Sequence, residues 1–191
     1  ARHVSTGQEL WGYKVHQGTV LYLALEDDES RLQRRMFRMV GVEGTSSLHF
    51  ATSAKMLGSG LDEQLEKFVR EHSDTKLIIV DTLQKVREAV SDSYSYSSDY
   101  EVIGKLKQFA DRYGVCVLIV HHTRKQPAGD SFEMISGTTG LLGCADGALL
   151  MQKEKLTLQI RALQKTHVYL IQSIILKTLF VLFLLHRQQR M

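Results

Sequence analysis

Four short apolar runs, each bounded by polar residues, constrain the fold of this chain more than any other feature. They are Thr19 to Leu25 (TVLYLAL), Lys76 to Asp81 (KLIIVD), Val115 to Val120 (VCVLIV) and Asp146 to Met151 (DGALLM). Strands that are apolar along their whole length are typical of parallel sheets covered by helices on both faces. We therefore expect an α/β fold in which a parallel sheet is flanked by helices.

The segments between these runs have the spacing of amphipathic helices. Apolar stripes predict helices from Ser30 to Gly41, from Leu61 to Glu71 and from Val102 to Tyr113. A short strand is possible over Leu48 to Ala51, and Leu156 to Ile160 could pair with the last apolar run as a hairpin. Strands therefore alternate with helices, as a parallel sheet requires.

The polar residues that follow the apolar runs are the candidate functional groups, because ligands bind beyond the carboxyl ends of parallel strands. These residues are Glu26, Asp81, His121 and His122. The run ending in Asp81 has the Walker B pattern, in which a carboxylate on a rigid strand end holds Mg²⁺ through its water shell. Many buried strands also end in an acid simply because the chain surfaces there, and that explanation fits Asp81 alone equally well.

The ordered set of motifs resembles a known family. The runs VLYLALEDDESRLQRR, LIIVDTLQKV, VLIVHHTRK and SGTTGLLGCADGALLM are similar to the RecA-like P-loop ATPases of the plasmid RepA and DnaB helicase group, often labelled AAA-family ATPases. The resemblance covers residues 7–152. It implies a RecA-like core that uses ATP and Mg²⁺ and acts on DNA, as a replicative or mobile-element helicase does.

The resemblance also implies roles for three of the strand-end residues. Glu26 would polarise the attacking water, Asp81 would support magnesium, and His122 would sense the γ-phosphate, with His121 as the second choice for that sensor. An arginine finger would come from a neighbouring subunit. Arg161 lies in a plausible region for it, but the family pattern is already fading there.

Contacts with nucleic acid are expected after the third apolar run. The SGTTG segment matches the family region that faces the central channel or the neighbouring subunit, so Ser136 and Thr138 are expected to contact nucleic acid. Arg124 and Lys125 stand close by and could meet phosphate from either the nucleotide or DNA.

Each assignment has a structural alternative. Glu26 could be an acid of the following helix N-terminus, an explanation that suits Asp27 and Asp28 better. The two adjacent histidines could suggest zinc, but neighbouring strand residues point to opposite sides and no third ligand has metal spacing. We interpret the arginines of the first predicted helix as a solvated face, and Ser91 to Tyr100 as a flexible surface loop.

The sequence departs from the family pattern in its phosphate-binding loop. No GxxxxGK[ST] motif occurs in the 191 residues, and the opening ARHVSTGQELWG resembles the segment that follows the helix after this loop. The amides and lysine of such a loop supply most phosphate binding, so we expect a core truncated before its first strand that binds ATP weakly or not at all. By the resemblance, the absent strand lies between those ending at His122 and Met151, which would leave an apolar slot with two unpaired edges.

A second departure is the C-terminal tail. We expect a partial ATPase core over residues 1–155 and an apolar tail over residues 156–191, which contains the 18-residue run VYLIQSIILKTLFVLFLL. Three interpretations compete: a membrane anchor, a helix or strand that fills the vacated core, and a non-native tail from a reading-frame change. The abrupt loss of family pattern favours the third. Lys177 would cost about 2.5–3.5 kcal/mol at the centre of a membrane span, which counts against the first.

Composition adds little about partners. A net charge of +3 is too small to indicate a polyanionic ligand by itself. Cys116 and Cys144 lie in apolar segments, which indicates reduced thiols and, without a signal peptide, a cytoplasmic protein. The resemblance implies single-stranded or plasmid DNA as partner and a hexameric ring of identical subunits. The alternative function is a non-catalytic nucleic-acid or protein binding module derived from this fold.

Overall fold

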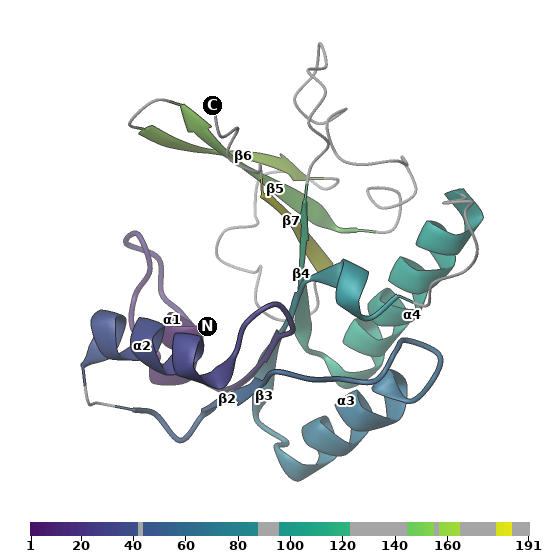
Figure 1. Cartoon of the computed structure of the whole chain (residues 1–191), viewed down its shortest axis with the longest axis horizontal. Helices are drawn as coiled ribbons and strands as arrows, with labels where there is room; N and C mark the ends of the chain where they lie inside the picture. Colours follow the sequence, from purple (N-terminus) through teal and green to yellow (C-terminus); the bar gives the residue numbers. More distant parts are fainter. Residues whose placement is uncertain (42–43, 88–95, 123–144, 155–156, 165–178, 185–191) are drawn as a thin grey trace.

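A single sheet with helices on both faces forms the centre of the molecule (Figure 1). The computed structural model describes residues 1–41, 44–87, 96–122, 145–154, 157–164 and 179–184. Within these residues the sheet has seven strands, in the order β2-β1-β3-β4-β7-β5-β6. The predicted α/β fold is confirmed.

Most helices and strands follow the predicted segments, but the first helix, the 3₁₀ helix and the last strand were not predicted. The helices are α1 (Arg2–Thr6), α2 (Glu29–Val40), α3 (Leu61–Glu71) and α4 (Tyr96–Tyr113), with a 3₁₀ helix η1 (Leu83–Lys85). The strands are β1 (Thr19–Ala24), β2 (Leu48–Ala51), β3 (Thr75–Asp81), β4 (Cys116–His122), β5 (Gly147–Glu154), β6 (Thr157–Gln164) and β7 (Leu179–Leu184). The interpretation of Ser91 to Tyr100 as a loop is wrong over residues 96–100, where α4 has already begun.

Nearly all strand pairs are parallel. β1 pairs with β2 and β3, β3 with β4, and β7 with both β4 and β5, all in parallel. β6 is antiparallel to β5, which confirms the predicted hairpin. The carboxyl ends of β1, β3, β4, β5 and β7 therefore lie at one edge of the sheet.

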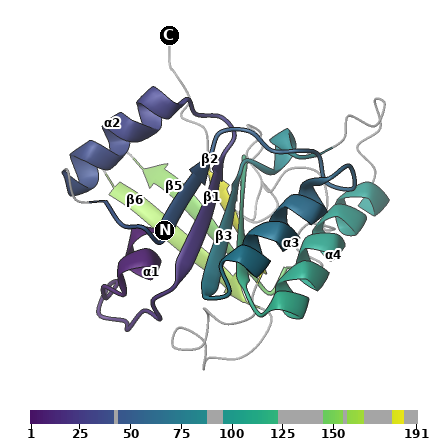
Figure 2. The same ribbon diagram turned by 90° about the horizontal axis from the view of Figure 1, so that it is seen from below.

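Alternating side chains of the central strands build an apolar core on each face of the sheet. Leu21 and Ile78 belong to the larger core, which includes buried residues of α3 and α4 (Figure 2). Val20 and Ile79 belong to the smaller core on the opposite face, where Val4 of α1 packs against it. Burying a side chain of this size contributes about 1.5–3 kcal/mol, so these alternating residues fix the register that aligns the strand ends.

Helix α2 starts immediately after β1 because Asp28 caps it. The Asp28 carboxylate accepts a hydrogen bond from the backbone N–H of Arg31 at 2.7 Å. Gly41 ends the helix with a positive φ of 68°, and its N–H donates to the carbonyl of Phe37. Only residues 25–28 separate β1 from α2, so the cap holds this short connection at the carboxyl edge of the sheet.

Part of the C-terminal tail forms an interior strand of the sheet. β7 lies between β4 and β5, as in the interpretation that a strand fills the vacated core position. Residues 165–178 and 185–191 lie outside the described part of the chain. Among helices built from described residues, none has the length and apolar character needed to cross a membrane.

Candidate functional site

Three of the predicted site residues meet at the carboxyl edge of the sheet. Asp81 is the last residue of β3, and its backbone pairs with Ala24 on one side and Val120 on the other. Glu26 follows β1 by two residues, and His122 ends β4. The parallel register thus brings together groups that lie far apart in the sequence.

Glu26 is held by side chains from two other strand ends. Its Oε1 accepts a hydrogen bond from the Thr82 hydroxyl at 3.0 Å, and its Oε2 lies 3.6 Å from Nε2 of His122. The latter contact is an ion pair when His122 is protonated. The Glu26 side chain remains 42% exposed, so its carboxylate is oriented while still accessible to a ligand.

Asp81 is oriented by a tyrosine from the neighbouring strand. Its Oδ2 accepts a hydrogen bond from the Tyr22 hydroxyl at 2.5 Å. Burial raises the pKa of Tyr22, and the hydrogen bond to Asp81 raises it further, so the phenol remains a donor at neutral pH. The Asp81 carbonyl also accepts from the backbone N–H of Leu25 at 2.7 Å, which ties the end of β3 to the segment that carries Glu26.

The two adjacent histidines occupy different environments, as strand alternation requires. His121 is buried, and its pKa is lowered to about 4, first by burial and then by the charges of Arg87 and His122. His122 is 37% exposed and lies beside Glu26. His121 is therefore neutral at physiological pH, and His122 is the member of the pair that can reach a ligand at the strand ends.

The neighbouring acids Asp27 and Asp28 serve helix α2. Asp28 caps the helix, whereas Asp27 pairs with Arg31 at 3.2 Å and with Arg35 at 2.5 Å. Both arginines are more than half exposed, in agreement with a solvated helix face. A role at the N-terminus of α2 therefore explains Asp27 and Asp28. Glu26 has no such role and lies at the strand-end site.

Tyr22 and Thr82 are the site residues that the sequence analysis missed. The peptide bond that joins Asp81 to Thr82 is cis. Tyr22 could have been identified as a candidate from the sequence. It is the one residue with a hydroxyl inside the run VLYLAL, and it lies four positions before Glu26. Its partner could not be read from the sequence, because the contact depends on the register between β1 and β3.

Several predicted residues lie where the structure gives no description. Arg124, Lys125, Ser136 and Thr138 all fall within residues 123–144, outside the described residues. The backbone of Arg161 lies in β6 and pairs with Leu150. The expected contacts of these residues with phosphate, DNA or a neighbouring subunit therefore stay predictions.

The donor set at the strand ends suits magnesium better than a softer metal. Glu26, Asp81 and Thr82 present oxygen atoms, which Mg²⁺ prefers. Oδ2 of Asp81 accepts the Tyr22 hydrogen bond, and no hydrogen bond to Oδ1 is formed by the described residues. In the part of the chain that the structure describes, no three His, Cys, Asp or Glu side chains converge to hold a metal by themselves. Magnesium would therefore need phosphate and water oxygens as further ligands.

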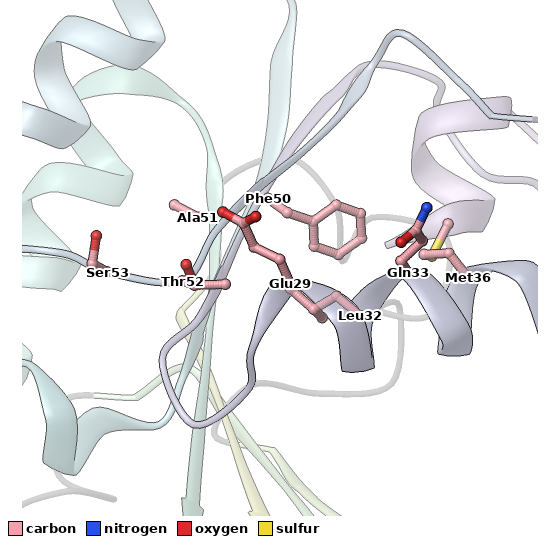
Figure 3. Close-up of a pocket in the computed structure, with 8 residues that line it drawn as sticks. All are labelled: Glu29, Leu32, Gln33, Met36, Phe50, Ala51, Thr52 and Ser53. Atoms are coloured by element: carbon pink, nitrogen blue, oxygen red, sulfur yellow. The ribbon is translucent and has the colours of Figure 1, made fainter.

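A separate open pocket lies between α2 and the edge strand β2 (Figure 3). It has a volume of about 500 Å³ and is lined by Glu29, Leu32, Gln33, Met36, Phe50, Ala51, Thr52 and Ser53. The Phe50 ring points toward the helix that carries Gln33 and Met36 (Figure 3). Its lining includes one carboxylate and no basic side chain, which does not suit a phosphate ligand.

Comparison with known proteins gives one family. The sequence profile described as an AAA domain matches residues 1–128. This region spans β1 to β4 and therefore includes Glu26, Asp81 and His122. No curated protein matches the chain.

Proposed function

The chain belongs to the AAA domain family of P-loop ATPases, and from this premise we propose that it is part of an ATP-dependent, DNA-acting ATPase. Within that family we assign it to the RecA-like group of plasmid RepA and DnaB-type helicases. The observation that carries the proposal is the strand-end cluster, in which Glu26 and Asp81 are each oriented by a hydroxyl donor at one edge of a parallel sheet.

In the proposed reaction, Glu26 acts as the general base. Its carboxylate would accept a proton from the water that attacks the γ-phosphate. Thr82 holds Oε1, and Oε2, which lies beside His122, would face that water. His122, 3.6 Å from Glu26, would contact the γ-phosphate. After hydrolysis, His122 would lose its contact with the γ-phosphate. Its interactions would therefore differ between the ATP-bound and ADP-bound states.

Asp81 is proposed to hold magnesium through Oδ1 while Tyr22 fixes Oδ2. When bound with the nucleotide, the ion would neutralise charge on the phosphates. The amides and lysine of a phosphate-binding loop would supply the remaining phosphate contacts, and no GxxxxGK[ST] motif occurs in the 191 residues. We therefore propose that this chain alone binds nucleotide weakly and is inactive in hydrolysis without such a loop.

The DNA-acting role rests on the resemblance to the helicase group. Lys125, Ser136 and Thr138 are proposed to contact single-stranded DNA, and Arg124 to contact phosphate. A ring of identical subunits, with ATP between neighbours, would place such contacts around a central channel. Binding of a labelled oligodeoxythymidine, measured by fluorescence anisotropy, tests this part. The proposal requires affinity that falls with added salt and falls again in Lys125→Ala.

The nucleotide site is tested by a MgATP titration with matched carboxylate variants. We expect millimolar binding that requires magnesium and is lost in Asp81→Asn, because that change removes the charge facing the ion. Asp111→Asn is the control, because Asp111 is an exposed α4 carboxylate that pairs with Lys107 away from the strand ends. ATP turnover by the unmodified chain would contradict the proposed inactivity, and turnover that persists in Glu26→Gln would also remove the assignment of Glu26.

A second candidate function is a non-catalytic nucleic-acid or protein binding module. The specific observation in its favour is the lack of a phosphate-binding loop motif in the sequence. Failure to bind MgATP at millimolar concentration, together with retained binding of the oligonucleotide, would favour this module. Micromolar affinity for MgATP would exclude it.

A further inference from the structure

The single tryptophan of the chain lies at the tip of a turn between α1 and β1. Leu10 and Tyr13 pair across this turn through two backbone hydrogen bonds, of 3.0 and 2.9 Å. The two residues between them, Trp11 and Gly12, have positive φ values of 54° and 82°, as the central residues of a type I′ turn do. We refer to residues 10–13 as the Trp11 turn.

The segment that carries the Trp11 turn is fixed at its base, while its tip is exposed. The backbone N–H of Gly18 donates to the carbonyl of Val4 at 3.1 Å, and the Gln17 side chain donates to the carbonyl of Ser5 at 3.3 Å. The Trp11 side chain nevertheless remains 77% exposed, more than any other large apolar residue that the structure describes. A bulky residue rarely adopts a positive φ. The fold thus holds a large apolar side chain in solvent on an anchored turn.

The pocket between α2 and β2 has the size and chemistry to accept an indole ring (Figure 3). Its volume of about 500 Å³ lies in the range in which proteins bind small organic groups. Leu32, Met36 and Phe50 give it apolar walls. The side chains of Glu29 and Gln33 also line it and supply oxygen acceptors, which the donor-only indole N–H requires when it is buried.

The apolar surface of this pocket continues along α2. Phe37 follows the pocket residue Gln33 by four positions, and Met39 follows the pocket residue Met36 by three, so each lies on the same side of the helix as its partner. Phe37 and Met39 are 62% and 63% exposed. Exposed apolar residues that adjoin a pocket mark a surface for interaction with another molecule.

The Trp11 turn cannot enter the pocket of its own copy. It precedes the amino end of β1, whereas Thr52 and Ser53 of the pocket follow the carboxyl end of the parallel neighbour β2. The six residues of β1 span about 20 Å at the usual rise of a strand. In Figure 2 the connection from α1 to β1 extends away from α2. The anchored base keeps the turn at that end of the sheet.

The charges around the Trp11 turn favour a protein partner over nucleic acid. Residues 8–17 contain one acidic residue, Glu9, and one Lys or Arg residue, Lys14. Sites that stack bases on aromatic side chains combine them with a positively charged groove, which this segment does not provide. A tryptophan on a surface without net charge is instead typical of the residues that contribute most to protein–protein contacts.

We propose that Trp11 of one copy of this chain inserts into the α2–β2 pocket of a second copy. The turn and the pocket are different surfaces of one chain, so the contact is head-to-tail and repeats until a ring closes or a filament grows. The inference deepens the proposed assembly of identical subunits, on which it rests for the identity of the partner. Its main tests need no nucleotide, so it can fail while the proposed nucleotide site stands.

Tryptophan fluorescence of the full chain tests the contact, because Trp11 is the only tryptophan. Its emission should shift to shorter wavelength as the protein concentration rises from micromolar to millimolar. Met36→Glu places a charge in the pocket and should weaken association at least about ten-fold, the loss typical of a central contact residue. Ser30→Glu is the control, because it adds the same charge to α2 at a residue that does not line the pocket. Equal shifts in the two variants would overturn the proposal.

Mixing two variants tests whether the turn and the pocket are the two halves of one contact. Trp11→Ala lacks the side chain but keeps the pocket, whereas Met36→Glu keeps the side chain but lacks the pocket. Sedimentation velocity should show monomers of each variant alone and a dimer, with no larger species, in the equimolar mixture. Met56→Ala, which removes an exposed side chain outside the pocket, should associate as the unmodified chain does. A mixture that stays monomeric would contradict the proposal.

Two further outcomes are distinguishable. If the emission of Trp11 changes with added oligodeoxythymidine but not with protein concentration, the turn contacts nucleic acid and the proposal is wrong. If circular dichroism shows that Met36→Glu does not fold, Ser53→Tyr replaces it, because Ser53 is an exposed residue of the pocket and a larger side chain there fills the space. Association that persists in a chain unable to bind MgATP would support this contact and remove only the nucleotide site.

Discussion

Replacement of Tyr22 by phenylalanine is the sharpest test of how the candidate site is held together. The change removes one oxygen, and with it the 2.5 Å hydrogen bond to Oδ2 of Asp81, without altering the ring in the strand. Hydrogen bonds to charged groups contribute about 1.5–3 kcal/mol. Both partners are only partly buried, so we take the lower part of this range and expect a loss of about 1.5–2 kcal/mol.

The assay is unfolding by urea and by heat, each followed by circular dichroism. In a domain of this size, a loss of 1 kcal/mol lowers the melting temperature by about 2–4 °C. Tyr13→Phe is the control, because Tyr13 is 41% exposed and its change should leave the free energy of unfolding within about 0.5 kcal/mol.

A double-mutant cycle isolates the contact itself. Asp81→Ala and Tyr22→Phe are measured alone and together, and the pair should show a coupling energy of about 1 kcal/mol. A coupling energy near zero, with Tyr22→Phe as stable as the unmodified chain, would refute the inference that Tyr22 orients Asp81.

Two further predictions concern the framework around the site. Since the pKa of buried His121 is lowered to about 4, its contribution to stability is fully present above about pH 6.5 and is lost as the pH falls toward 4. His121→Phe should therefore remove up to about 3 kcal/mol of the pH dependence of unfolding, and identical pH profiles would contradict this. Asp28→Ala removes the cap of α2 and should lower the free energy of unfolding by about 1 kcal/mol, measured in urea, whereas a neutral effect would show that the cap contributes nothing.

The sequence was sufficient to predict the sheet and the strand-end residues, because those features depend on local patterns. An apolar run such as KLIIVD specifies a buried strand and the position of its terminal acid at the same time. The amphipathic spacing of Leu61 to Glu71 likewise gave the bounds of α3. These predictions need no knowledge of which strands are neighbours.

The contacts within the site could not be predicted, because they depend on pairing between distant segments. Tyr22 reaches Asp81 only because β1 and β3 are neighbours in parallel register. Thr82 reaches Glu26 for the same reason. A run of apolar residues specifies that a strand is buried but not which strands it pairs with.

The position of the C-terminal strand could not be predicted either, because it too depends on strand pairing. The segment Leu179–Leu184 belongs to an 18-residue apolar run whose composition alone does not decide between a membrane anchor, a core strand and a non-native tail. Its place in the sheet depends on pairing with β4 and β5, which are formed by other parts of the chain. The preference for a reading-frame change came from the lost family pattern, which carries no information about pairing.

Chemical-shift mapping shows whether MgATP binds at the strand-end residues. Isotope-labelled chain is titrated to millimolar MgATP, and backbone amide shifts are compared with those of Asp81→Asn and Asp111→Asn. The account predicts shifts at Glu26, Thr82 and His122 that disappear in Asp81→Asn and persist in Asp111→Asn. Shifts that avoid the carboxyl edge of the sheet, or that are unchanged in Asp81→Asn, would contradict it.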